Sequence, residues 1–70
     1  MPYLVTHGTG PTAIDQKPDL DSALAHACLL IADGKPNVAI QDGEGKKISG
    51  NDLVACCNGE KKLTADLRAN

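Results

Sequence analysis

The sequence predicts an α+β domain in which a small, mostly antiparallel sheet packs on one main helix. Two observations lead to this prediction. Residues 20–33 carry apolar side chains at helical spacing, and a pair of short β-rich segments joined by a glycine-containing turn lies on each side of them. A shorter helical segment follows the second pair. The expected order is therefore ββαββα, with short connections throughout.

The first pair of strands is expected in residues 2–15. Residues 2–7 alternate in hydrophobicity and are rich in β-formers, as in a strand with one buried face. Residues 8–11, with the sequence GTGP, are typical of a turn, because glycine permits positive φ and proline fixes the exit. We expect residues 12–15 to return as a second, weaker strand.

The main helix, residues 20–33, has the clearest boundaries in the sequence. Asp19 or Asp21 can cap its N-terminus, Gly34 suits the left-handed position after its end, and Pro36 prevents continuation. Its apolar residues recur every three or four positions and share one face, which we expect to form the centre of the core: Leu20, Ala23, Leu24, Ala27, Leu30 and Ile31.

Residues 38–42 and 46–49 are expected to form a second β-hairpin around a turn that contains Gly43 and Gly45. Asp42 and Glu44 in this turn invite comparison with a calcium-binding loop. Placing Gly45 at the sixth position of such a loop puts Ile40 at the first, so the ligand pattern fails.

A short second helix is expected over about residues 52–58, capped by Ser49 or Asn51 and stopped by Gly59. Residues 61–70 form a possible tail with only two apolar anchors, Leu63 and Leu67. The sequence of this tail is compatible with two conformations, one helical turn or an extended segment across the sheet.

Residues 1–70 suit a single domain with a small core, because the chain has one aromatic residue, Tyr3, and no Phe or Trp. Chains of this size gain little net stability from burial, so we expect a marginally stable monomer or a homodimer. The formal net charge is −2, with the signs interspersed. This balance gives no reason to expect nucleic acid as a partner.

Residues 1–3 open directly into strand-like sequence without a basic segment or an apolar stretch, so we expect no export signal and a cytoplasmic location. The longest apolar run, residues 27–32, is far short of the roughly 20 residues that a membrane span needs. We therefore expect no membrane partner. Three cysteines, an odd number, argue against a disulfide framework and for reduced thiols.

Three segments together resemble a known kind of small domain. The YLV strand, the alanine-rich stretch DLDSALAHACLLIADG and the glycine-turn segment VAIQDGEGKKI are similar to uncharacterised small bacterial domains of the strand-strand-helix-strand-strand type, over about residues 2–50. A looser similarity is to partial RNase-like antitoxin domains, where only Pro18 matches the expected residues between strand and helix. The first resemblance implies a fold and carries no known activity or catalytic residues.

The cysteines Cys28, Cys56 and Cys57 and the histidines His7 and His26 are the candidate metal or redox residues. His26 and Cys28 lie about 200° apart around a helix, on opposite sides, so one ion cannot be held by both. The adjacent cysteines can both face the core, close to a helix C-terminus that opposes a thiolate. We expect structural thiols here, no cofactor and no bound metal, and a partly exposed His26 at the boundary of the core.

Catalysis is not expected. His7 beside the glycines of residues 8–10 lacks the helix N-terminus that a phosphate-binding loop needs, and no Ser-His-Asp or Cys-His-Asn set follows from the pattern.

One apolar residue, Leu29, falls on the outer side of the main helix, opposite Leu20. With Leu63 and Leu67 of the tail it could form an interaction patch, or the tail could cover it. The sequence therefore favours a small non-enzymatic interaction module that binds itself or another protein. The alternative is a soft-metal-binding or thiol-redox protein that uses the Cys56-Cys57 pair.

Overall fold

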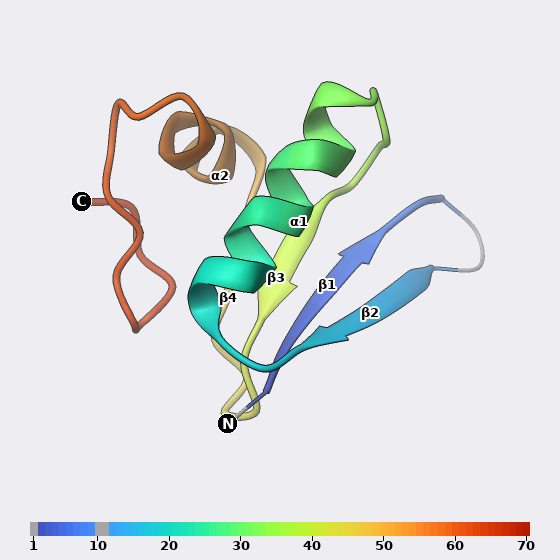
Figure 1. The fold of residues 1–70 in the computed structure, drawn as a ribbon, viewed down its shortest axis with the longest axis horizontal. Coiled ribbons are helices and arrows are strands. Elements are labelled where there is room, and N and C mark those ends of the chain that lie inside the picture. The colour runs from blue at the N-terminus through green and yellow to red at the C-terminus, as the bar shows by residue number, and fades with distance from the viewer. Residues whose placement is uncertain (1, 10–11) are drawn as a thin grey trace.

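The computed structural model of the protein describes residues 2–9 and 12–70. It is an α+β fold in which one four-stranded antiparallel sheet carries the main helix on one face, with the second helix beside it (Figure 1). The expected class and the expected order ββαββα are confirmed. The elements are β1 (Tyr3–His7), β2 (Ala13–Lys17), α1 (Leu20–Ala32), β3 (Ala39–Gln41), β4 (Lys47–Ser49) and α2 (Gly50–Cys57).

The sheet has the strand order β2-β1-β3-β4, so β1 is central although it comes first in the chain. Val5 of β1 pairs with Ile40 of β3, and Ile40 pairs with Ile48 of β4. Since residues paired across antiparallel strands point to the same face, these three apolar side chains line the inner face under α1. Alternation then places their chain neighbours on the opposite, open face.

β2 extends further than the expected segment, residues 12–15, because its last two residues also pair with β1. Gln16 lies opposite Leu4, and Lys17 lies opposite Tyr3. These polar residues have little intrinsic preference for a strand, so their conformation comes from the partner strand. Part of the expected turn over residues 8–11, Gly10 and Pro11, lies outside the described residues; Gly8 donates its N–H to the carbonyl oxygen of Pro36 at 2.9 Å.

α1 is capped by Asp19, one of the two candidates. Its carboxylate accepts a hydrogen bond from the backbone N–H of Ser22 at 2.7 Å, and this bond holds the pKa of Asp19 below its usual value. At the other end, Gly34 has the positive φ of 82° expected of the residue after a helix, and Lys35 donates its N–H back to Leu30 at 3.0 Å.

The core lies between α1, the inner face of the sheet and α2. Ala23 and Ala27 of α1 are completely buried, as are Val5, Ile40 and Leu53. The apolar side chains of α1 that flank these alanines are partly buried and pack around the same cluster: Leu20, Leu24, Leu30 and Ile31. The face expected from the sequence thus forms the contact with the sheet.

The tail adopts neither of the two expected conformations. Leu63 and Ala69 form an antiparallel bridge, so the tail turns back on itself beside α2 (Figure 1). Leu67 has a positive φ of 57°, which is unfavourable for a branched side chain, and it is only 3% exposed. Burial in the core is what offsets this backbone strain.

No helix among residues 2–9 and 12–70 is both long enough and apolar enough to cross a membrane.

Candidate functional site

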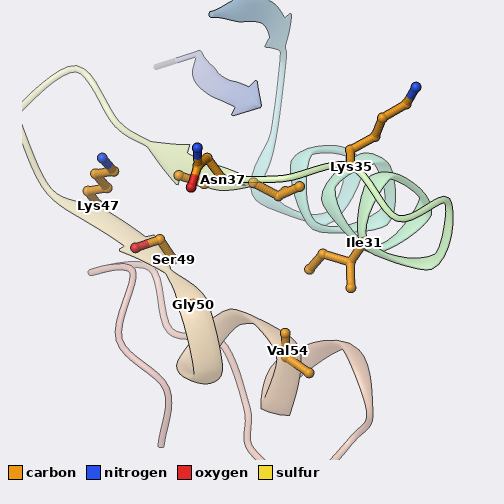
Figure 2. A pocket seen from close by; sticks show the side chains of 9 residues that line it. Ile31, Lys35, Asn37, Lys47, Ser49, Gly50 and Val54 are labelled. Atoms are coloured by element: carbon orange, nitrogen blue, oxygen red, sulfur yellow. The ribbon is translucent and has the colours of Figure 1, made fainter. Parts of the chain in front are cut away.

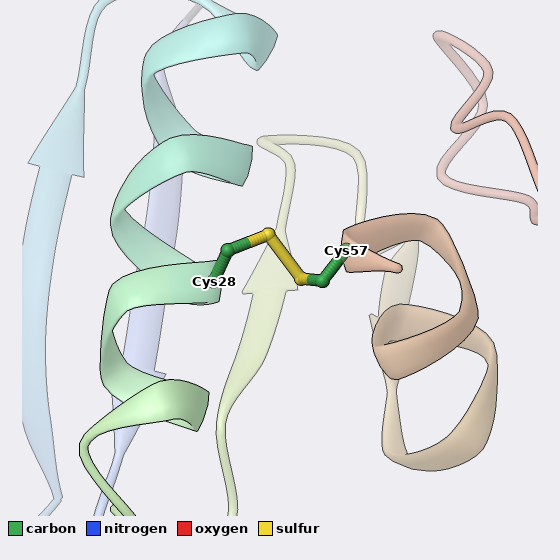
Figure 3. Close-up of a disulfide and its surroundings, with 2 residues drawn as sticks. All are labelled: Cys28 and Cys57. Atoms are coloured by element: carbon green, nitrogen blue, oxygen red, sulfur yellow. A yellow bond between two sulfur atoms is a disulfide. The ribbon is translucent and has the colours of Figure 1, made fainter. Parts of the chain in front are cut away.

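A disulfide joins the middle of α1 to the end of α2. Cys28 and Cys57 are bonded through their Sγ atoms, with their Cα atoms 5.5 Å apart, although they are separated by 29 positions in the sequence (Figure 3). The Cα separation is typical of native disulfides. The expectation of reduced thiols at all three cysteines is therefore wrong for this state of the protein.

Parity of the cysteine count could not reveal this pairing. An odd number leaves one thiol over but does not prevent the other two from pairing, and the choice of pair depends on how α2 packs beside α1. Cys28 lies at the edge of the apolar face of α1, as the helical spacing indicates, and α2 covers that edge. Cys57 is partly buried against the same core.

The remaining thiol, Cys56, belongs to the core and is 9% exposed. Burial raises its pKa above the usual value, and the nearby carboxylate of Asp52 raises it further, while Lys61 acts in the opposite direction. Because the thiolate is the nucleophilic form, Cys56 is a poor nucleophile in the folded state.

The candidate metal ligands are not assembled into a site. Within the described ranges, 2–9 and 12–70, no three His, Cys, Asp or Glu side chains converge in a way that could hold an ion. Cys28 and Cys57 are bonded to each other and so offer no thiolate. His7 ends β1, and its buried Nδ1 has no hydrogen-bond partner among the described residues.

A histidine–carboxylate pair that the sequence reasoning missed joins the edge strand to α1. Nε2 of His26 lies 2.8 Å from Oδ2 of Asp15, and the two side chains are 27% and 49% exposed. Asp15 lies opposite Val5 in the sheet, so it points to the side that α1 covers. The alternation of side chains along β2 places Asp15 on the inner face, and this alternation was the sequence signal for a contact with α1. His26 is partly exposed, and its contact with Asp15 connects α1 to β2.

A hollow with a volume of about 520 Å³ lies between the end of α1, the start of β3, β4 and the N-terminal half of α2 (Figure 2). Ile31, Val38 and Val54 supply its apolar wall, and Lys35 and Lys47 lie at its two ends. Figure 2 shows the Lys35 side chain extending away from Ile31 and Val54. Polar side chains also line the hollow, among them Asn37 and Ser49 (Figure 2).

The outer side of α1 carries one of the two exposed large apolar side chains of the described residues, and the other is Ile14 of β2. Leu29 is 69% exposed, the highest value of any large apolar side chain in the described chain. The expected patch of Leu29, Leu63 and Leu67 does not form, because Leu67 is buried and Leu63 packs against the core. The tail lies beside α2 and leaves Leu29 uncovered.

No family model, curated protein or solved structure matches the chain. The resemblance to small bacterial domains therefore stays a prediction from the sequence.

We expect reduction of the Cys28–Cys57 disulfide to destabilise the fold by about 3.5 kcal/mol, because closing a loop of about 30 residues restricts the unfolded chain by roughly this amount. Urea unfolding with and without a phosphine reductant measures the difference. Thiol counting in denaturant should give one thiol per chain before reduction, from Cys56, and three afterwards.

The matched controls are single serine substitutions at the adjacent cysteines. Cys56→Ser should retain the effect of the reductant, whereas Cys57→Ser should abolish it. Three titratable thiols in the purified, unreduced protein would contradict the pairing.

Proposed function

We propose that this protein is a small non-enzymatic interaction module whose contact surface is the outer face of α1. This outer face comprises the residues of α1 that lie within about 60° of Leu29 around the helix at 100° per residue: Ser22, Ala25, His26, Leu29 and Ala32. The observation that carries the proposal is the exposure of Leu29, at 69%, among exposed alanines. An exposed apolar stripe such as Ala25, Leu29 and Ala32 on the outer face of a helix is typical of a helix that packs against a further partner.

The described surface gives weaker support for catalysis or metal binding than the outer face gives for a protein contact. His26 and Asp15 form an isolated pair, and Cys56 is a buried thiol with a raised pKa. A protein is thus the class of partner best supported.

A Leu29→Glu substitution tests the proposed surface. In extracts of the protein's own cells, the tagged wild-type chain should elute from a sizing column above the mass of one chain, and the variant should elute as one chain. A charge on the outer face prevents burial of that face in a complex.

Ile14→Glu is the matched control, since Ile14 is 61% exposed on the open face of the sheet. This variant should elute like the wild type. Equal elution of the wild type and Leu29→Glu would refute the proposal for this surface.

A second function, thiol-redox chemistry, is favoured by one observation: Cys28 and Cys57 are paired, and Cys56 is adjacent in the sequence. In such a reaction a dithiol donor gives two electrons and two protons to the Cys28–Cys57 bond. The bond opens to two thiols, and the donor becomes a disulfide. In a reducing cytoplasm, the state of this bond would then follow the redox poise of the cell.

Acid quenching of living cells, followed by alkylation, tests this second function. A redox role predicts both one-thiol and three-thiol forms of the chain, with the ratio shifting after oxidant treatment. A single form that does not respond to oxidant or reductant in the cell would leave the disulfide with a structural role only.

A further inference from the structure

We infer that the hollow beside β4 binds a small amphipathic anion, a monocarboxylate with a short aliphatic chain. In this arrangement the carboxylate lies at the end of the hollow that holds Lys47 and Ser49, and the aliphatic chain lies against Ile31 and Val54. The site is separate from the outer face of α1, so the inference goes beyond the proposed function and does not depend on it.

The lining of the hollow is polar at one end and apolar at the other. Figure 2 shows Asn37, Lys47 and Ser49 at one end, with Ile31 and Val54 at the other. These residues line one volume of about 520 Å³, which falls in the range of about 300–1,000 Å³ that is typical of small-molecule sites. A ligand that fills the hollow therefore needs one polar end and one apolar end.

The polar end has hydrogen-bond donors that the fold leaves free. Lys47 and Ser49 point to the same side of β4, because Ile48 between them points into the core and is 4% exposed. Within residues 2–9 and 12–70, the hydroxyl of Ser49 makes no capping hydrogen bond to α2. Nδ2 of Asn37 donates to the carbonyl oxygen of Gly8 at 3.3 Å, which fixes the amide and uses one of its two hydrogen atoms.

The charge of the lining favours an anion. Lys35 and Lys47 both line the hollow, whereas no Asp or Glu of the described chain does. Neither lysine forms an ion pair with any described residue, in contrast to Lys46, whose Nζ lies 3.0 Å from Oδ1 of Asp66. In a chain with a net charge of −2, the hollow is thus a local site of positive charge.

The positions of the two lysines favour a ligand with a single charge. Lys47 alone supplies an ammonium group at the polar end, and it matches one carboxylate better than a phosphate monoester, which carries nearly two negative charges at neutral pH. Lys35 borders the apolar end, and its side chain extends away from Ile31 and Val54 (Figure 2). The surface of these two side chains is therefore left for an aliphatic chain.

Binding should be weak and should depend on chain length. An eight-carbon acid has about ten non-hydrogen atoms, for which the usual efficiency of small ligands predicts a roughly millimolar dissociation constant. Each methylene group buried against Ile31 and Val54 should strengthen binding about fourfold. Octanoate should therefore bind about tenfold more tightly than hexanoate.

Titration of the isotope-labelled purified chain with sodium octanoate, followed by its amide chemical shifts at constant ionic strength, tests the site. The amides of Ser49, Gly50 and Val54 should shift and reach saturation. Octylammonium has the same aliphatic chain with the opposite charge, and it should not saturate these shifts because Lys47 repels it.

Lys47→Glu should raise the octanoate dissociation constant about tenfold or more, since the variant replaces an attraction by a repulsion. Lys47→Gln, which only removes the charge, should have a smaller effect in the same direction and serves if the first variant does not fold. The matched control is Lys62→Glu, which makes the same charge change on an exposed residue of the tail and should bind octanoate like the wild type.

Leu29→Glu separates this site from the proposed function. Octanoate should bind this variant as it binds the wild type, because the outer face of α1 takes no part in the site. Shifts confined to the residues around Leu29, equal binding of octanoate and octylammonium, or wild-type affinity in Lys47→Glu would each overturn the inference. So would the absence of any saturable shift.

Discussion

The close contact between α1 and the inner face of the sheet is the constraint on which the other features depend. Ala23 and Ala27 are both 0% exposed, and they contact a sheet surface built around Val5 and Ile40. Alanine keeps the helix backbone near the strands, so a chain without Phe or Trp can still enclose a continuous core. The larger leucines of α1 lie at the edges of this contact, where they are partly buried: Leu20, Leu24 and Leu30.

α2 completes this core from the side and is held there in two ways. Leu53 is completely buried in the same cluster, and the Cys28–Cys57 disulfide fixes the end of α2 to the middle of α1. The edge strand β2 is held from the other side, where Asp15 meets His26. With its two flanks occupied and its inner face buried, α1 has its outer face left for a partner, which is why the proposed function uses this face.

Sequence periodicity predicted the class, the order of elements and the buried face of α1, because these follow from local spacing and turn residues. It did not predict the strand order, since the central position of β1 depends on long-range pairing with β3. The disulfide and the burial of Leu67 were missed for a similar reason: both depend on where α2 and the tail pack. Leu67 also has a positive φ, which the residue type itself disfavours.

The most direct measurement of the central contact is the free energy of unfolding of Ala27→Leu compared with that of Ala25→Leu, in dilute protein. The two substitutions make the same chemical change in one helix, and Ala and Leu have similar helix propensities. Ala27 is fully buried against the sheet, whereas Ala25 is exposed. We expect Ala27→Leu to lose about 1–3 kcal/mol or more by overpacking, and Ala25→Leu to stay within about 0.5 kcal/mol of the wild type. Equal stability of the two variants would contradict the close packing of α1 on the sheet.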